Sequence, residues 1–285
     1  MMFSDVLLTV DFDRTMTGPD SKIPQRNLDA VAFFTANGGT FTINTGRSVA
    51  SFQKHLGKVP VNAPILMYNG SARWENGKLT KLKLLDMELW ETVRTIRKEF
   101  PHMNLEIQGA DLHYLIDPEP AYVAFYDALK WGYRIAKEGE DLGPFLKFAL
   151  AGTPRSKGVA TLFDISETED TAFDAAQERI LELWDGKVEV YRAAPRIIDV
   201  HAKGVSKIAA ARQLQQELGK KILVCAGDAE NDIPMLEGAD YAFTPADGVV
   251  ADRFPNVCNC ADGAIADIIY KKIPEILGFS LDIKA

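Results

Sequence analysis

Two carboxylates one residue apart, Asp11 and Asp13, lie just behind the apolar run Val6–Leu8, which opens the predicted strand Val6–Val10. Such a stretch is typical of a buried parallel strand, and ligands of open α/β sheets bind beyond the carboxyl ends of the strands. At that edge one carboxylate can attack as a nucleophile while the other transfers a proton. Acids in a turn also cap the segment that follows, so the pair alone leaves a capping role open. Groups at other strand ends must decide between the two interpretations.

Two further acids follow a second predicted strand near the other end of the chain. The stretch Lys221–Ala226 leads into Gly227, which permits a tight turn, and then into Asp228 and Asp232. Asp232 stands at the opening of a predicted helix that begins at Ile233. We therefore expect these acids to lie at a strand end, as the first pair does.

Groups that suit an oxyanion follow a third predicted strand, Thr40–Asn44. Thr45, Gly46 and Arg47 offer a hydroxyl, backbone N–H groups and a guanidinium at a helix start, which together suit phosphate. Before a later helix, Lys207 offers a compact positive charge. Taken singly, Arg47 and Lys207 are also consistent with solvated surface charges.

Four carboxylates that meet at one edge of a sheet would repel one another strongly in a low dielectric. A hard divalent cation makes such a cluster tolerable, and Mg²⁺ prefers a few carboxylates together with water and phosphate oxygens. Arg47 and Lys207 then remain to neutralise a phosphoryl group. The combination of nucleophile, acid/base, metal and oxyanion contacts indicates phosphoryl transfer.

Four motifs carry a family resemblance, and they are Asp11-x-Asp13-x-Thr15, Thr45-Gly46-Arg47, Lys207 and Gly227-Asp228-x-x-Asn231-Asp232. They resemble the motifs of the haloacid dehalogenase (HAD) superfamily, and the arrangement is most similar to its Cof-like phosphatases. Two supporting stretches agree: Pro64–Gly70 resembles the family's strand that ends in Asn-Gly before the cap, and Asp262–Ala266 resembles its final helix start. The resemblance covers nearly the whole chain.

The resemblance implies a role for each matched residue. Asp11 would be the nucleophile that forms an aspartyl-phosphate, and Asp13 the general acid and then the general base. Mg²⁺ would be held by Asp11, the Asp13 backbone carbonyl and Asp228, with Asp232 in support. The phosphoryl group would be held by the other matched residues, which are Thr45 and Lys207, with Asn231 close to it.

The residue after the second acid departs from the family pattern. The family usually has glycine there, whereas this chain has Arg14. Arg14 must adopt an allowed backbone geometry or distort the loop, because glycine relieves crowding at that place. Its guanidinium either reaches the substrate or the cap, or it faces solvent, so the departure bears on substrate preference more than on reaction type.

The elements that position these residues alternate between strands and helices over the first part of the chain. Helices are expected at Pro24–Asn37 and Ser48–Leu56, and a further strand at Ile65–Tyr68. The resulting βαβαβ order predicts an α/β fold with a doubly wound parallel-sheet (Rossmann-like) core. We expect residues 1–80 and 193–285 to form this core.

The pattern changes between residues 81 and 192, which we expect to form an inserted α+β cap domain. Its predicted elements are helices at Met87–Phe100, Pro120–Trp131 and Thr171–Trp184, and strands at Asn104–Gln108, His113–Ile116, Ala160–Ile165 and Val188–Tyr191. Residues Gly143–Lys147 are expected to form a turn that leads into an apolar segment. A cap that closes over the strand ends would exclude water and contact the leaving group, so it should set specificity.

Composition is consistent with a cytoplasmic enzyme. A chain of 285 residues can hold two domains, and a net charge of -8 argues against partners such as nucleic acid or an anionic membrane. We expect no signal peptide and no spanning helix, because no apolar run approaches ~20 residues. Three cysteines suit a reducing compartment, and Cys258 and Cys260 are expected to be ordinary strand residues rather than metal ligands. The chain is expected to be a monomer or a homodimer.

The function these residues predict is an Mg²⁺-dependent phosphatase acting on a small phosphorylated metabolite, with sugar phosphates the leading class of substrate. One alternative is a phosphomutase, because capped HAD mutases use matching acids and return the phosphoryl group to a bound sugar. The other is a non-catalytic protein that binds a phosphometabolite, with Arg14 as the sign of lost activity. All expected catalytic positions are chemically intact, which argues against this second alternative.

Overall fold

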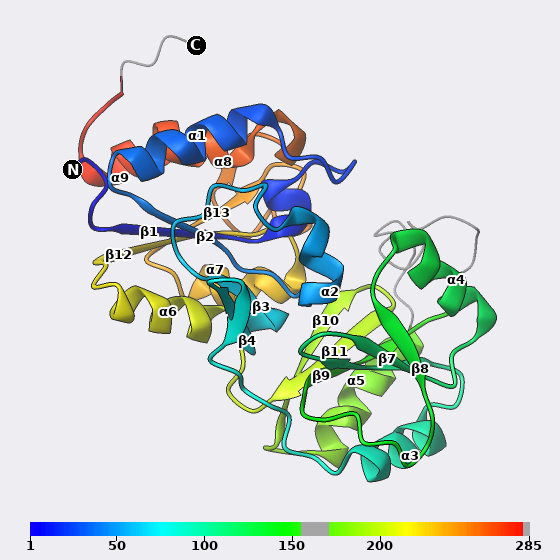
Figure 1. Cartoon of the computed structure of the whole chain (residues 1–285). Coiled ribbons are helices and arrows are strands. Elements are labelled where there is room, and N and C mark those ends of the chain that lie inside the picture. The colour runs from blue at the N-terminus through cyan, green and yellow to red at the C-terminus, as the bar shows by residue number, and fades with distance from the viewer. Residues whose placement is uncertain (155–170, 282–285) are drawn as a thin grey trace. The chain divides into compact units, whose positions relative to one another are not determined.

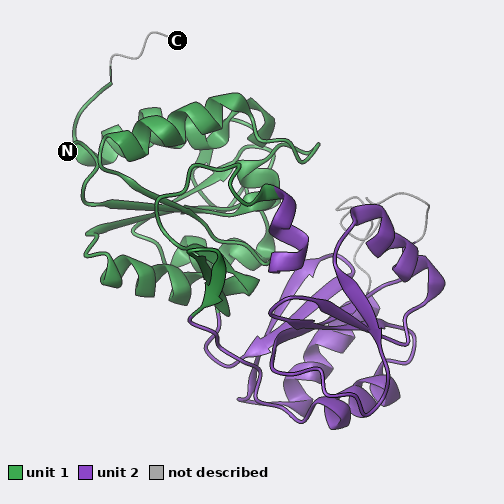
Figure 2. Ribbon diagram, in the orientation of Figure 1, with its two compact units in different colours: residues 1–46, 55–80, 206–285 green, residues 47–54, 81–205 purple. Residues whose placement is uncertain are grey.

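The computed structural model describes residues 1–154 and 171–281. The chain divides into two compact units, of which unit 1 comprises residues 1–46, 55–80 and 206–285, and unit 2 residues 47–54 and 81–205 (Figure 2). Within the described ranges, no helix combines the length and the apolar character that crossing a membrane requires.

Unit 1 is built on a parallel sheet of five strands with helices on both faces, α1 and α8 on one and α6 and α7 on the other (Figure 1). The strand order is β14 (Asn256–Val257), β13 (Tyr241–Pro245), β12 (Ile222–Ala226), β1 (Val6–Val10) and β2 (Thr40–Ile43). All four pairings are parallel, and every residue of β1 is buried, as the apolar stretch predicts. The expected doubly wound α/β core is therefore confirmed.

The helices of unit 1 bury apolar side chains against this sheet. Their bounds are α1 Gln25–Ala36, α6 Lys207–Glu217, α7 Ile233–Glu237, α8 Ala264–Asp267 and α9 Ile273–Leu277. On the α6 face, Leu214 and Met235 pack with Leu7 and Leu223 of the sheet in one fully buried cluster. This packing holds the first turns of α6 and α7 beside the ends of β1 and β12.

The predicted strand Ile65–Tyr68 does not extend the parallel sheet as the βαβαβ pattern led us to expect. β3 (Ile65–Met67) pairs antiparallel with β4 (Ala72–Glu75), which pairs with β5 (Lys78–Thr80), and only the isolated parallel bridge Asn44↔Leu66 connects it to the end of β2. The cause lies directly after β3. Tyr68, Asn69 and Gly70 all have positive φ, so the chain turns back within three residues.

Unit 2 is an α+β unit with a six-stranded, mostly antiparallel sheet. Its order is β10 (Val188–Ala194), β11 (Ile197–Ala202), β9 (Phe145–Ala151), β6 (Asn104–Gly109), β7 (His113–Ile116) and β8 (Tyr133–Ala136). Its helices are α3 (Leu89–Glu99), α4 (Pro120–Leu129), α5 (Thr171–Leu183) and the short α2 (Val49–Phe52). One face of the sheet is apolar, and there Ile107, Phe148 and Val200 pack with Ile96 of α3 and Ile180 of α5.

Three strands of unit 2 differ from the prediction. β9 begins within the stretch expected to be a turn, and β8 and β11 were not predicted at all. Because β11 pairs with both β10 and β9, unit 2 continues to Val205, whereas the sequence pattern places the return to the core at residue 193. The predicted strand Ala160–Ile165 lies outside the described residues.

Candidate active site at the carboxyl edge of the parallel sheet

Two carboxylates of unit 1 meet because β1 and β12 are neighbouring parallel strands. Val10 lies opposite Ala226 in the register, and the backbone N–H of Asp11 donates to the carbonyl of Ala226 at 2.8 Å. Asp228 follows two residues after the end of β12. Carboxylate oxygens of Asp11, Asp228 and Asp232 all lie within 4.8 Å of one another, and all three residues are buried.

Lys207 bridges two of these acids. Its Nζ lies 2.5 Å from Oδ1 of Asp11 and 2.6 Å from Oδ1 of Asp232, and its side chain is 3% exposed. Lys207 is the first residue of α6. Ser206 caps the N-terminus of this helix, because its side-chain oxygen accepts a hydrogen bond from the N–H of Ala209 at 3.1 Å. The side-chain amide of Asn44 donates to the Lys207 carbonyl at 2.9 Å, so the end of β2 fixes the lysine as well.

The loop after β12 orients the remaining carboxylates. Asp232 Oδ2 accepts the backbone N–H groups of Asp228 at 3.1 Å and Ala229 at 3.2 Å, and Thr15 Oγ1 donates to Oδ1 of Asp228 at 2.9 Å. A Cβ at Gly227 would lie 2.5 Å from Cβ of Asp232, so only glycine fits there. The carboxylate of Asp232 is thus held by two backbone N–H groups and Lys207, and that of Asp228 by the side chain of Thr15.

Burial and mutual repulsion raise the pKa values of the acids. The pKa of Asp11 rises from its ordinary 3.8 to about 7, chiefly through burial; Lys207 lowers it, and Asp232 and Asp13 raise it. Burial likewise holds the pKa of Asp228 well above its ordinary value, with Asp11 and Asp232 adding to the effect. Burial alone would lower the pKa of Lys207, but the carboxylates of Asp11 and Asp232 outweigh it and hold it high.

This donor set fits a hard divalent cation. The group Asp11, Asp228 and Asp232 offers only carboxylate oxygens, which are the ligands Mg²⁺ prefers. Its excess of negative charge is also what a cation would relieve, because the three carboxylates outnumber the positive charges of Lys207 and Arg14 beside them. The Asp13 carboxylate is not part of this group, and the resemblance expects only its backbone carbonyl to bind metal.

Arg14 keeps the loop geometry that glycine would adopt. Its φ is 57°, in the left-handed region, which costs an arginine roughly 1–2 kcal/mol. Its backbone N–H donates to Thr17 Oγ1 at 3.2 Å, and its Nε lies 3.8 Å from Oδ2 of Asp228, with about a third of the side chain exposed. Arg14 therefore places a second positive charge beside the acidic group, next to Asp13 in the same turn.

The loop of Thr45 and Gly46 is held against the turn that follows β3. The buried Thr45 donates its N–H to Leu66 at 2.9 Å, and its carbonyl accepts the N–H of Asn69 at 3.0 Å. A Cβ at Gly46 would lie 2.8 Å from Oδ1 of Asn69, so the close approach needs glycine. Asn231 is half-buried in the short turn Glu230–Asp232 that leads into α7.

Arg47 lies in unit 2, where it contacts other residues of that unit. Its guanidinium donates to the carbonyl of Ser51 at 3.1 Å and lies 6.0 Å from the ring centre of Trp131. Among the predicted site residues, the structure brings the side chains of Asp11, Asp228, Asp232 and Lys207 into one group.

Two contributors to the site, Asn44 and the side chain of Thr15, were not identified from sequence as contacts. Their only sequence signal is a polar side chain at a strand end or in a motif.

The cysteines form no part of the acidic group. Cys260 is buried and its thiol donates to Asp247 at 3.1 Å, while the N–H of Cys258 donates to Asp267 at 3.4 Å. Both are free thiols, and burial raises the pKa of each above its ordinary value.

Comparison with known proteins identifies the family. The model of the haloacid dehalogenase-like hydrolases matches residues 8–250. The chain is 23% identical over 238 residues to 5-amino-6-(5-phospho-D-ribitylamino)uracil phosphatase YcsE of Bacillus subtilis, covering 82% of this chain and 80% of YcsE. BT1666 from Bacteroides thetaiotaomicron, a HAD phosphatase, has a TM-score of 0.73 at 18% identity, covering 95% of this chain and 94% of that one. The HAD subclass IIB sugar phosphatase BT4131 has a TM-score of 0.70 at 16% identity, covering 95% and 98%.

The solved structures share the fold, including the cap, and the family match spans both the parallel core and the insertion. The chain therefore belongs to the haloacid dehalogenase-like hydrolases.

Proposed function

We propose that the chain is an Mg²⁺-dependent phosphatase that hydrolyses a small phosphomonoester through an aspartyl-phosphate on Asp11. The observation that carries this proposal is the buried ion pair between Lys207 and Asp11, directly beside Asp228 and Asp232. Lys207 opposes the effect of burial on Asp11, so it favours the ionised form that a nucleophile requires.

The proposed reaction has two steps, both at phosphorus. In the first, an oxygen of Asp11 attacks the phosphorus and the bond to the leaving oxygen breaks, while Asp13 gives that oxygen its proton. In the second, Asp13 takes a proton from water, the water oxygen attacks the phosphorus, and phosphate leaves as the Asp11 carboxylate is restored. The aspartate pair thus returns to its starting protonation state.

The other proposed site residues bind rather than react. Thr45, Gly46, Arg47, Lys207 and Asn231 would hold the oxygens of the phosphoryl group. A divalent cation held by Asp11, Asp228, the Asp13 carbonyl and, in support, Asp232 would offset the negative charge that develops there. Sugar phosphates are the proposed substrate class, which is supported by the name of BT4131 as a sugar phosphatase.

A phosphate-release screen over phosphorylated metabolites, with Mg²⁺, tests the proposal. We expect release from at least one sugar phosphate by the wild-type protein and none by Asp11→Asn, a matched variant that keeps the shape of the side chain. Conversion of a hexose 1-phosphate into an isomer without phosphate release would instead show a mutase. Binding of the phosphometabolite without turnover by the wild type would refute the catalytic proposal.

A further inference from the structure

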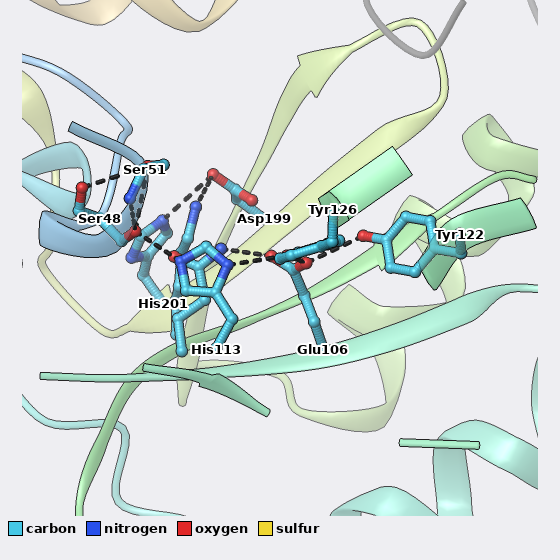
Figure 3. A network of polar contacts seen from close by, with 10 residues as sticks. Ser48, Ser51, Glu106, His113, Tyr122, Tyr126, Asp199 and His201 are labelled. Carbon is cyan, nitrogen blue, oxygen red and sulfur yellow. Dashed lines mark hydrogen bonds and ion pairs between the residues drawn. The ribbon is translucent and has the colours of Figure 1, made fainter. Parts of the chain in front are cut away.

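Unit 2 contains a buried chain of hydrogen bonds that the proposed reaction does not use (Figure 3). Tyr126 donates its hydroxyl to the carboxylate of Glu106, and the same hydroxyl lies 2.8 Å from Nδ1 of His113. On the other side of the ring, Nε2 of His113 lies 2.5 Å from Oγ of Ser48. All four residues are buried.

The carboxylate of Glu106 decides which group is the donor in every hydrogen bond of this chain. It accepts hydrogen bonds from Tyr126, from Tyr122 at 2.9 Å and from the side-chain amide of Gln108, so it acts only as an acceptor. Because the Tyr126 proton points to Glu106, the Tyr126 oxygen must accept from His113, which therefore carries its proton on Nδ1.

The direction then continues to Ser48. Burial lowers the pKa of His113 to about 3, with Lys147 adding to the effect, so the ring is neutral and has a single N–H. Its Nε2 is consequently an acceptor, and the Ser48 hydroxyl donates to it. The oxygen of Ser48 is left to accept the N–H of Ser51 at 3.1 Å, which caps α2.

The chain of contacts ends at Arg47. The helix that Ser48 caps has only four residues, Val49–Phe52, so it depends on outside contacts for its stability. Arg47 directly precedes the cap and donates to the carbonyl of Ser51 within that turn. A change in the Ser48 hydroxyl therefore acts on the backbone that carries the Arg47 guanidinium.

We propose that Glu106, Tyr126 and His113 are positioning residues that hold Arg47 through the hydroxyl of Ser48. This rests on the proposed function in one respect, namely that Arg47 contacts the phosphoryl oxygens. The hydrogen-bonded chain itself does not depend on that assignment.

A matched pair of tyrosine variants tests the proposal. Tyr122 and Tyr126 are both buried and both donate to Oε2 of Glu106, but only Tyr126 contacts His113. We expect Tyr126→Phe to raise KM for the phosphomonoester and the inhibition constant of inorganic phosphate by roughly 3- to 10-fold, the worth of one hydrogen bond. We expect Tyr122→Phe to lower thermal stability about as much as Tyr126→Phe does. It should leave KM and the inhibition constant of inorganic phosphate unchanged.

Two further variants identify the route. Ser48→Thr keeps the hydroxyl and should match the wild type, whereas Ser48→Ala should match Tyr126→Phe. Combining Tyr126→Phe with Arg47→Ala should weaken phosphate binding no more than Arg47→Ala alone, because both changes act on the same contact. Equal shifts in Tyr122→Phe and Tyr126→Phe, or additive losses in the double variant, would overturn the proposal.

A readout that needs no turnover separates this proposal from the proposed function. Nitrogen NMR of the wild-type protein should show His113 as the neutral tautomer with its proton on Nδ1, and Tyr126→Phe should disturb that assignment. A proton on Nε2 would overturn the chain of hydrogen bonds. If the wild type releases no phosphate while the Nδ1 tautomer is seen, the proposed function fails and the hydrogen-bonded chain stands.

Discussion

The raised pKa of Asp11 predicts how the stability of the metal-free protein depends on pH. The group has a pKa of about 7 in the folded chain against an ordinary 3.8. Between these values the folded chain holds a proton that the unfolded chain has lost. The free energy of unfolding must therefore fall as pH rises through this window, which is the opposite of the usual behaviour of a paired acid.

The size of the change in the free energy of unfolding depends on how many pH units between the two pKa values the measurement covers. Each pH unit within it changes the free energy of unfolding by about 1.4 kcal/mol for one group, so the loss from pH 5 to pH 7 is about 2–3 kcal/mol. His113 and His201 act in the opposite direction, because burial holds the pKa of both below the ordinary value of 6.5. Their contribution must be cancelled before that of Asp11 can be seen.

The assay cancels it by comparing wild type with Asp11→Asn, both after chelation. Both chains carry the same two histidines, so the difference in their free energies of unfolding isolates Asp11 together with its effect on the pKa of Asp228. Denaturant unfolding at half-unit steps from pH 5 to 7 should show the wild type losing stability relative to the variant. Mg²⁺ should remove most of the slope for the wild type, because a bound cation favours the ionised acid.

If the difference in the free energy of unfolding between the two chains did not change from pH 5 to pH 7, the reasoning would be refuted. A flat result would mean that Lys207 outweighs burial and keeps Asp11 ionised at pH 5. A difference that instead grew in favour of wild type with rising pH would show a lowered pKa, and the buried acids would then be fully compensated without a cation.

Three further predictions concern the other groups of the site. Asp13→Ala should slow turnover by about 10²–10⁴-fold on an alkyl phosphate, and by less on p-nitrophenyl phosphate, whose leaving group needs little protonation; equal losses in steady-state assays of both esters would contradict a general acid. Mg²⁺ should raise the melting temperature as well as the activity, and Asp228→Ala should weaken both effects, so activity that survives exhaustive EDTA treatment would exclude a catalytic metal. Lys207→Met should lower the free energy of unfolding at pH 7 by about 3–5 kcal/mol, the usual cost of breaking a buried ion pair, and by less at pH 5, where protonated acids need the cation less; calorimetry at both pH values would check this.

The parallel core could be predicted because its signals are local. A stretch with Thr9 as its one polar residue predicts β1 with its bounds, since a strand buried on both faces is apolar nearly throughout. The acidic edge follows from topology, because parallel neighbours end on the same side of the sheet. The placement of Asp11 beside Asp228 is thus a consequence of the strand pairing Val10↔Ala226.

The cap strands were harder because their polar residues are compensated from far away in the chain. β9 carries Lys147 in the middle of an apolar stretch, and this buried charge pairs at 2.6 Å with Asp199 on β11, 52 residues later. The local sequence around Lys147, taken without Asp199, predicts the end of a turn. The same holds for β11, whose Asp199 and His201 lie on the buried polar face of the sheet.

Arg14 changes the charge balance of the site in a way that the motif alone does not suggest. When Asp11, Asp13, Asp228 and Asp232 are all ionised, these four carboxylates face the two cations Lys207 and Arg14, and two negative charges remain. One divalent cation neutralises that remainder. With glycine in place of Arg14 three negative charges would remain, so this chain should bind Mg²⁺ less tightly than a relative with glycine there. In exchange it presents one more positive charge, next to Asp228, to an anionic substrate.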